Sequence, residues 1–135
     1  MSEQRRRLTE MNKTILLIED NEQNRYLATF LLEKRGYSVV PASDGVTGIE
    51  LGLCFQPKGI LLDIHLPGLD GYEVARALRR NALLDGVPII AVTSYAMAGD
   101  REKAMEAGCD GYIEKPIDPD TFVSEVEKLF LREQT

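Results

Sequence analysis

The chain has 135 residues, which is enough for one domain with a hydrophobic core and too few for two. Apolar residues make up 44% of the sequence and charged residues 28%, proportions that are ordinary for a globular protein. The net charge of -6 argues against nucleic acid or a membrane surface as the main partner, and no apolar run is long enough to span a bilayer.

The first eleven residues, MSEQRRRLTEM, are polar and show no helical or strand periodicity. They are predicted to form a tail in front of a single domain at residues 12–135. No apolar segment follows the basic residues of this tail, so it is not a secretory signal. The two cysteines, Cys54 and Cys109, match no metal-ligand spacing, and we interpret both as buried thiols of a protein in the reducing cytoplasm.

Behind the tail, short apolar runs alternate with segments that have helical periodicity. Continuous apolar runs of this kind suit parallel strands that are covered on both faces. They predict five strands, at Thr14–Ile18, Tyr37–Pro41, Gly59–Asp63, Ile89–Thr93 and Gly111–Glu114.

Five helices are predicted, one after each strand. Those after the first and fourth strands should end at Gly36 and Gly108, since glycine readily adopts the left-handed conformation that ends a helix. The fourth helix, at about 98–107, is short and mostly polar, and the arginines of the third (Arg76, Arg79 and Arg80) should face water. The residues expected to face inward are Leu27, Phe30 and Leu31 in the first helix, Ile49 and Leu53 in the second, Val74 and Leu78 in the third, and Phe122, Val126, Leu129 and Phe130 in the last.

Five successive strand–helix units predict a three-layer α/β sandwich with right-handed crossovers. Ligand sites in such sheets lie beyond the carboxyl ends of the strands, where the strand order reverses. If the order is 2-1-3-4-5, this crevice lies between the first and third strands. Asp20 follows the first strand and Asp63 ends the third, so the two acids should meet there.

Polar residues stand at or just past the ends of four predicted strands: Glu19, Asp20, Asp63, Thr93, Ser94 and Lys115. Two carboxylates about 4 Å apart repel by roughly 4 kcal/mol at an effective dielectric constant near 20. A divalent cation relieves this repulsion, and Mg²⁺ prefers a few carboxylates together with water and a phosphate oxygen. A carboxylate can also attack phosphorus to give an aspartyl phosphate, while a metal, the lysine and the threonine hydroxyl stabilise the transferring group.

Each of these residues also has a plainer interpretation when taken alone. Glu19 and Asp20 suit the N-terminus of a helix, and Lys115 could be a solvated lysine before a turn proline. Thr93 is a β-branched residue in a strand, and His65, the only histidine, makes no metal site by itself. The plainer interpretations would require all the polar groups to meet at one rim by chance, so we favour a functional site.

Four motifs carry a family resemblance: EDN at 19–21, LLDIHLPGLDG at 61–71, VTS at 92–94 and GYIEKP at 111–116. With them, residues 12–132 resemble the receiver domain of bacterial response regulators, the phosphoacceptor part of two-component signalling. The resemblance implies a flavodoxin-like fold of the chemotaxis-regulator type, with a five-stranded parallel sheet in the order 2-1-3-4-5 and five helices.

The resemblance also implies roles for the acids. Asp63 would be the phosphoacceptor. Glu19, Asp20 and Asp63 would hold Mg²⁺, with His65 offering its backbone carbonyl to the ion.

Four further roles follow from the same resemblance. Thr93 would be the switch hydroxyl that follows the phosphoryl group, and Lys115 would neutralise that group. Pro116 resembles the proline that follows this lysine through a cis peptide bond. Tyr112 matches the aromatic residue that changes rotamer on phosphorylation.

The chain departs from the family pattern at Lys58 and Gly59, where an acid and an apolar residue are usual. Glycine at the start of a strand should weaken the packing there. His65 and Tyr95 occupy variable positions that tune the loss of the phosphoryl group.

The implied function is that of a signalling protein, which catalyses only its own phosphorylation and dephosphorylation. It would take a phosphoryl group from a histidine kinase or a phosphotransfer protein in the cytoplasm. A downstream protein would then bind the face formed by residues 98–132, without direct contact to nucleic acid or membrane, and two copies could form a weak homodimer. The chain would be a single-domain regulator or a piece of a longer regulator or hybrid kinase.

Three other functions would suit a similar fold. An aspartate-nucleophile phosphatase needs a second aspartate two residues after the nucleophile, where this chain has His65. A flavin or nucleotide carrier needs a phosphate loop rich in glycine or hydroxyls after the first strand, whereas EDNEQN at 19–24 is acidic. A constitutive interaction module would have no use for the acids and Lys115.

Overall fold

The computed structural model describes residues 13–94 and 97–132, so the predicted tail at 1–11 and Tyr95 lie outside the described residues. Five parallel strands form one sheet in the order β2-β1-β3-β4-β5, as predicted. The strands are β1 (Thr14–Ile18), β2 (Ser38–Ala42), β3 (Gly59–Asp63), β4 (Ile89–Thr93) and β5 (Gly111–Glu114). Four of them have the predicted bounds, and β2 is displaced by one residue toward the C-terminus.

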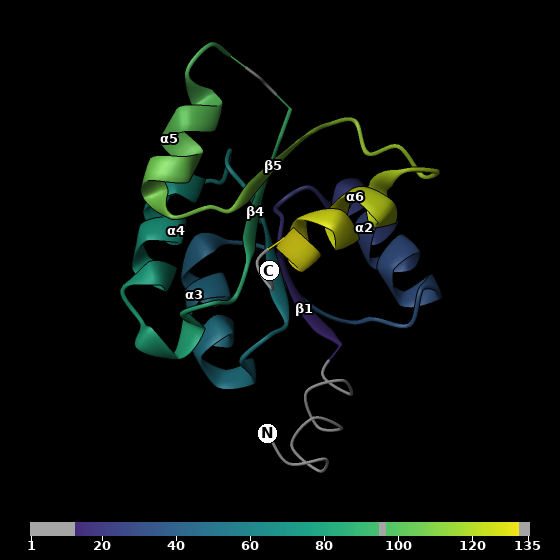
Figure 1. Ribbon diagram of the computed structural model, residues 1–135, viewed down its shortest axis with the longest axis horizontal. Helices are drawn as coiled ribbons and strands as arrows, with labels where there is room; N and C mark the ends of the chain where they lie inside the picture. Colours follow the sequence, from purple (N-terminus) through teal and green to yellow (C-terminus); the bar gives the residue numbers. More distant parts are fainter. Residues whose placement is uncertain (1–12, 95–96, 133–135) are drawn as a thin grey trace.

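Helices cover both faces of the sheet and complete the predicted three-layer sandwich (Figure 1). On one face lie α3 (Gly45–Phe55), α4 (Gly71–Arg79) and α5 (Asp100–Ala107), and on the other lie α2 (Glu22–Lys34) and α6 (Phe122–Arg132). A short 3-10 helix, η1 (Ala82–Leu84), precedes β4. No helix in the described parts of the chain combines the length and the apolar character needed to cross a membrane.

Each face of the sheet has its own apolar cluster, because side chains alternate along a strand. In β1, Leu16 and Ile18 belong to the cluster under α3, α4 and α5, which we call the α3–α5 cluster. Ile15 and Leu17 belong to the cluster under α2 and α6, the α2/α6 cluster. The continuous apolar runs therefore correspond to strands buried on both faces in β1, β3 and β4, whereas the edge strands β2 and β5 are partly exposed.

The inward face of α2 matches the predicted one only in part, since Leu31 packs against the α2/α6 cluster but Phe30 does not. Ala28 and Leu32 are buried against the sheet, whereas Phe30 is 52% exposed. At 3.6 residues per turn, residue 30 lies about 200° around the helix axis from residue 28 and must face away from the sheet. The small side chain of Ala28 belongs to the contact face, which a search for large apolar residues overlooks.

The inward face of α3 is made of three glycines and the predicted Ile49, which packs against the α3–α5 cluster, whereas the predicted Leu53 is not part of it. Gly45, Gly48 and Gly52 are buried, and Leu53 is 43% exposed. A Cβ atom at Gly48 would lie 2.5 Å from Cδ1 of Ile18, so glycine is required for α3 to lie this close to β1.

Arg79 of α4 does not face water, contrary to the prediction. Its guanidinium donates to the carbonyl oxygens of Gly108 and Leu84, both at 2.9 Å, and forms an ion pair with Asp110. The Asp110 carboxylate also accepts a hydrogen bond of 2.9 Å from the Ile89 N–H. Arg79 therefore ties α4 to the end of α5 and to the first residue of β4.

Only one of the two cysteines is buried. Cys109 lies in the α3–α5 cluster, and burial raises the pKa of its thiol to about 12. Cys54 is exposed on α3, so the prediction of two buried thiols is wrong for this residue. The prediction followed the general tendency of free cysteines to be buried, whereas Cys54 lies beside the exposed Leu53, away from the buried glycines of α3.

Gly59 does not leave a gap at the start of β3, contrary to the expected weak packing. The aromatic ring of Phe130 from α6 covers this glycine, and a Cβ atom at Gly59 would lie 2.2 Å from the Cζ atom of the ring. Phe130 is only 2% exposed, and it is buried together with Phe122 and Val126, as predicted for α6. The absence of a side chain at Gly59 thus leaves the space that the Phe130 ring of α6 fills.

Candidate functional site

Three carboxylates meet where β1 and β3 end. Glu19 and Asp20 follow β1, and Asp63 is the last residue of β3. One carboxylate oxygen from each residue lies within 4.8 Å of the others. Glu19 and Asp63 are buried, at 4% and 5% exposure, whereas Asp20 is exposed. The strand order brings the acids together, as the sequence led us to expect.

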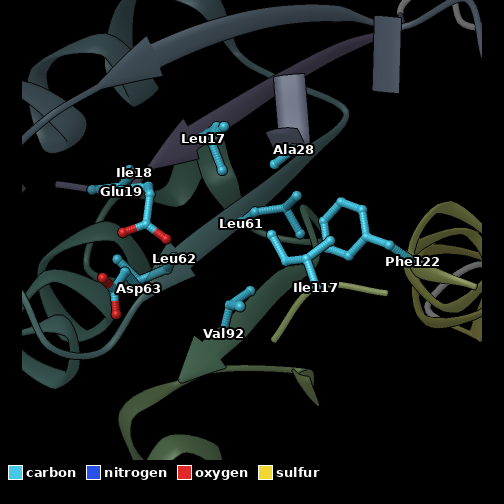
Figure 2. A pocket seen from close by; sticks show the side chains of 10 residues that line it. All are labelled: Leu17, Ile18, Glu19, Ala28, Leu61, Leu62, Asp63, Val92, Ile117 and Phe122. Carbon is cyan, nitrogen blue, oxygen red and sulfur yellow. The ribbon is translucent and has the colours of Figure 1, made fainter. Parts of the chain in front are cut away.

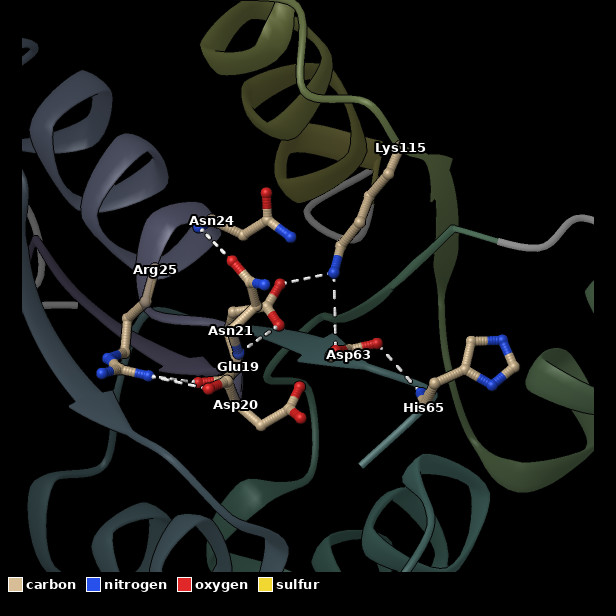
Figure 3. A network of polar contacts seen from close by, with 8 residues as sticks. All are labelled: Glu19, Asp20, Asn21, Asn24, Arg25, Asp63, His65 and Lys115. Atoms are coloured by element: carbon tan, nitrogen blue, oxygen red, sulfur yellow. Dashed lines mark hydrogen bonds and ion pairs between the residues drawn. The ribbon is translucent and has the colours of Figure 1, made fainter. Parts of the chain in front are cut away.

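Lys115 places a positive charge among these acids (Figure 3). It follows β5, and its Nζ atom lies 2.6 Å from Oε1 of Glu19 and 3.4 Å from Oδ2 of Asp63. Its side chain is 7% exposed, so the plainer interpretation of a solvated lysine does not hold. The peptide bond between Lys115 and Pro116 is cis, as the resemblance implied.

The two carboxylate oxygens of Asp63 have different partners. Oδ1 accepts a hydrogen bond of 2.9 Å from the backbone N–H of His65, and Oδ2 faces Lys115. The pKa of Asp63 is raised from 3.8 to about 7, chiefly by burial and then by the neighbouring Glu19, while the His65 N–H and the Lys115 charge lower it in part. A carboxyl with this pKa exchanges its proton near neutral pH, and an added cation would favour the ionised form.

The residues around Glu19 show that the acids are not helix caps. The N-cap of α2 is Asn21, whose Oδ1 accepts a hydrogen bond of 2.8 Å from the Asn24 N–H. Oε2 of Glu19 accepts from the Asn21 N–H at 3.2 Å, while its other oxygen contacts Lys115. Asn21 thus caps the helix and leaves both acids to the site.

His65 contributes its backbone to the site rather than its side chain. Its N–H holds Oδ1 of Asp63, and its imidazole is exposed and directed away from that carboxylate (Figure 3). The role implied for its backbone carbonyl stays a prediction.

Thr93 and Tyr112 lie on the face of the sheet that α5 covers. In the β4–β5 register Ala91 pairs with Tyr112 and Thr93 with Glu114, so these four residues share one face. Thr93 is 1% exposed, and its carbonyl oxygen accepts a hydrogen bond of 2.7 Å from the Lys115 N–H. The backbone therefore connects the predicted switch hydroxyl directly to the lysine.

Tyr112 is partly buried beneath α5. The ring packs against the α3–α5 cluster, and its hydroxyl oxygen is buried without a hydrogen-bond partner among the described residues. Burial raises the pKa of this hydroxyl, and the charge of Asp100 raises it further. Asp100 also accepts a hydrogen bond of 3.4 Å from the hydroxyl of Tyr72, a contact that the sequence did not suggest.

A small cavity lies beneath the carboxylates (Figure 2). Its volume is about 10 Å³, and Glu19 and Asp63 border it on one side while Ile117 and Phe122 border it on the other. Apolar side chains from β1, β3 and β4 complete the wall. Since its walls are almost wholly apolar, the floor of the site has a low dielectric constant, which explains the strong effect of burial on Asp63.

The donor set fits a hard divalent cation. Three carboxylates supply oxygen ligands, which suit Mg²⁺ better than a softer transition metal. Lys115 contacts two of these three carboxylates, and its single positive charge cannot neutralise all of them. These three acids could therefore hold a metal ion.

The raised pKa of Asp63 predicts how stability depends on pH in the presence of a chelator. Between the unfolded value of 3.8 and the native value of about 7, the folded chain binds more protons at this site, so its free energy of unfolding falls as the pH rises. The difference between the two pKa values corresponds to a loss of at most about 4 kcal/mol in the free energy of unfolding. Solvent screening at the rim of the sheet lowers this expected loss to about 2 kcal/mol.

Asp63→Asn isolates this effect, because asparagine cannot ionise. Urea unfolding of both proteins in chelator should show the wild type losing stability relative to Asp63→Asn between about pH 5 and about pH 8. A constant difference across this range would show that Asp63 does not titrate there.

Comparison with known proteins places these features in a family. The sequence profile of the response regulator receiver domain matches residues 15–127. The polar-differentiation response regulator DivK of Brucella ovis is 38% identical over 117 residues, which cover 87% of this chain and 95% of DivK. DivK of Brucella anthropi matches to the same extent.

Solved structures show the same relationship. The receiver domain of the sensor histidine kinase PA1611 from Pseudomonas aeruginosa, which has a magnesium ion coordinated in its active-site cleft, superimposes with a TM-score of 0.78 at 35% identity. The match covers 90% of this chain and 96% of that domain. The chemotaxis protein CheY4 of Vibrio cholerae superimposes with a TM-score of 0.82 at 22% identity, over 86% of this chain and 97% of CheY4. At this identity the comparison supports the fold alone.

Receiver domains are signalling proteins and are not generally classed as enzymes, and they interact with histidine kinases or phosphotransfer proteins and with downstream targets. The profile covers most of this chain, and the sheet order and acid cluster agree with it. The chain therefore belongs to the response regulator receiver domains, the phospho-accepting modules of two-component signalling.

Proposed function

We propose that Asp63 accepts a phosphoryl group from a phosphohistidine of a histidine kinase or phosphotransfer protein, with Mg²⁺ held by Glu19, Asp20 and Asp63. The observation that carries this proposal is the placement of Asp63, a buried carboxylate at a strand end with Lys115 Nζ 3.4 Å away and two further acids within 4.8 Å. No structural role requires that combination, since α2 has its own cap in Asn21.

The two oxygens of Asp63 have separate tasks in this proposal. The His65 N–H holds Oδ1, which leaves Oδ2 to attack phosphorus. The bond from Oδ2 to phosphorus forms as the bond from phosphorus to the imidazole nitrogen of the donor breaks, and the electron pair of that bond stays on the donor. Bound Mg²⁺ supplies the positive charge that keeps Asp63 ionised and offsets the phosphoryl charge.

Lys115 and Thr93 then stabilise the product. The Lys115 ammonium, now 2.6 Å from Glu19, is close enough to turn toward a phosphoryl oxygen on Asp63. The Thr93 hydroxyl would donate to another phosphoryl oxygen. Both residues thus respond to the same new charge, and the hydrogen bond from the Lys115 N–H to the Thr93 carbonyl keeps them together.

Labelling with a small phosphodonor tests the proposal. Incubation of the whole chain with acetyl phosphate should add one phosphoryl group in Mg²⁺ and none in excess chelator, as followed by intact mass. A cluster of three acids repels an incoming phosphoryl group when no cation is present. Labelling that is independent of Mg²⁺, or absent under both conditions, would contradict the proposal.

The response to phosphorylation is proposed to pass through Thr93 to Tyr112 and α5. Movement of the Thr93 hydroxyl toward the phosphoryl group would change the packing beneath α5, and the Tyr112 ring would adjust with it. α5 is short and buries only Ala104 and Ala107, so it should shift more easily than the other helices. The face that a downstream protein binds would lie within residues 98–132, and a weak homodimer could use the same face. The side chains of residues 131 and 132 lie outside the described part of the chain.

Thr93→Ala should keep phosphorylation at Asp63 but weaken this response. We expect labelling within about tenfold of wild type, because the hydroxyl supplies one hydrogen bond to a charged phosphoryl oxygen and takes no part in forming the bond to phosphorus. Backbone chemical shifts with and without beryllofluoride and Mg²⁺ should then change much less at residues 97–115 than in wild type. Thr93→Ser is the matched control, since it keeps the hydroxyl, and equal responses in all three proteins would contradict the coupling.

The proposal extends to the setting of the protein. The proposed reaction requires a phosphohistidine donor and Mg²⁺, so we propose a cytoplasmic location. One protein partner would donate the phosphoryl group, and another would bind the phosphorylated domain. The chain would catalyse only its own phosphorylation and dephosphorylation, which labelling by acetyl phosphate without any kinase would support.

A further inference from the structure

Arg25, near the start of α2, reaches back toward the acidic cluster (Figure 3). Its Nη1 atom donates to the carbonyl oxygens of Glu19 at 2.9 Å and of Asp20 at 3.4 Å. We infer that Arg25 is a positioning residue of the metal site, which fixes the backbone on both sides of Asp20 and thereby aims the Asp20 carboxylate. This inference rests on the proposed binding of Mg²⁺ by these acids.

The two carbonyl groups depend on Arg25 because they lie between two regular elements. The N–H of Glu19 still donates to Ala42 of the sheet, and the carbonyl of Asn21 already accepts the first helical bond of α2. Among the described residues, no backbone N–H donates to the carbonyl of Glu19 or Asp20. Arg25 therefore satisfies two acceptors that the strand and the helix leave over.

These two carbonyls determine where the Asp20 side chain points. The Glu19 carbonyl belongs to the peptide unit before the Asp20 Cα atom, and the Asp20 carbonyl belongs to the unit after it. Each peptide unit is planar, so holding both units fixes the two backbone dihedrals of Asp20 and the direction of its Cα–Cβ bond. One guanidinium group thus sets the orientation of this residue.

Asp20 needs such support more than the other two acids do. Glu19 is held by the Asn21 N–H and Lys115, and Asp63 by the His65 N–H and Lys115. In the parts of the chain that the structure describes, no hydrogen bond or ion pair reaches the Asp20 carboxylate, which is exposed. The described contacts therefore hold Asp20 through its backbone, which sets the position from which its carboxylate extends.

The charge of Arg25 and its hydrogen bonds act on Mg²⁺ in opposite directions. As a cation close to the site, Arg25 repels a metal ion, so loss of the charge alone would tighten Mg²⁺ binding. Loss of the two hydrogen bonds frees the Asp20 backbone and weakens binding. The sign of the change therefore distinguishes a positioning role from a purely electrostatic one.

The test is the dissociation constant of Mg²⁺, measured by calorimetric titration of the whole chain. Arg25→Ala should weaken Mg²⁺ binding about tenfold, the low end of the effect for groups that orient metal ligands. Arg25→Lys should recover part of this loss, because an ammonium can still donate to a carbonyl. Lys34→Ala is the matched control, since it removes a positive charge from the same helix without a contact to the site, and it should bind like wild type.

The outcomes separate this inference from the proposed function. Unchanged or tighter Mg²⁺ binding by Arg25→Ala, with wild type binding normally, overturns the positioning role. Absence of Mg²⁺ binding by wild type overturns the proposed metal site instead. Thermal melting without Mg²⁺ should show that Arg25→Ala is folded, because Asn21 still caps α2. If Arg25→Ala is not folded, the Mg²⁺ affinity of Arg25→Lys is compared with that of wild type. Equal Mg²⁺ affinities of these two proteins would overturn the inference.

Discussion

Replacement of Asp63 with asparagine should reduce phosphorylation by acetyl phosphate at least about 1,000-fold, because an amide oxygen is not a usable nucleophile toward phosphorus. Asparagine has nearly the same shape as aspartate, and its side-chain oxygen can still accept the hydrogen bond from the His65 N–H. The fold should therefore survive, and the loss would reflect chemistry alone. Intact mass after incubation with acetyl phosphate and Mg²⁺ measures the effect.

Asp70→Asn is the matched control for this substitution. Asp70 lies a few residues beyond the site, where its Oδ1 caps α4 by accepting a hydrogen bond of 2.9 Å from the Glu73 N–H. Asparagine caps helices about as well as aspartate, and Asp70 is not in the carboxylate cluster, so this variant should be labelled like wild type. Labelling of Asp63→Asn at the wild-type level would place the acceptor at another residue.

Gly59→Ala should lower the free energy of unfolding by about 3 kcal/mol, the upper part of the range for an overpacked core. The added methyl group would lie 2.2 Å from the Cζ atom of Phe130 and 2.5 Å or more from the other ring atoms that face it. The ring cannot be compressed, so α6 must move away from β3 or Phe130 must leave its rotamer. Urea denaturation of both proteins measures the cost.

Phe130→Leu provides the second arm of this test. Leucine is smaller, so Phe130→Leu alone should also destabilise the chain by leaving a cavity. The double variant should be more stable than the sum of the two single effects predicts, because the leucine leaves room for the alanine methyl group. Additive effects would show that Phe130 is not what makes glycine necessary at this position.

The strands could be predicted closely from sequence, whereas the inward faces of α2 and α3 could be predicted only in part, at Leu31 and Ile49. Apolar runs mark a strand that is buried on both faces, and four strands have the predicted bounds. Helix faces were assigned from large apolar residues, but α2 and α3 approach the sheet through Ala28, Gly48 and Gly52. Close packing by small residues leaves large ones such as Phe30 outside, and periodicity of large side chains gives no sign of it.

The acidic cluster was predictable because parallel strands bring their carboxyl ends to one rim. Glu19, Asp20 and Asp63 meet there for that reason alone. The contacts of Arg25 and Arg79 were not predictable, because both donate to backbone carbonyls, which every residue has. No sequence pattern identifies which carbonyl a long side chain will reach.

The two separate apolar clusters have a consequence for how this domain can evolve. The acids and the cavity below them adjoin the α2/α6 cluster, whereas Tyr112 and α5 belong to the α3–α5 cluster on the opposite face. Distant substitutions that share no packing partners have nearly independent effects. Substitutions at exposed residues of α2 such as Tyr26 and Phe30 should therefore leave the packing beneath α5 unchanged. Such independence lets one surface of the domain diverge during evolution while the packing behind the opposite surface is conserved.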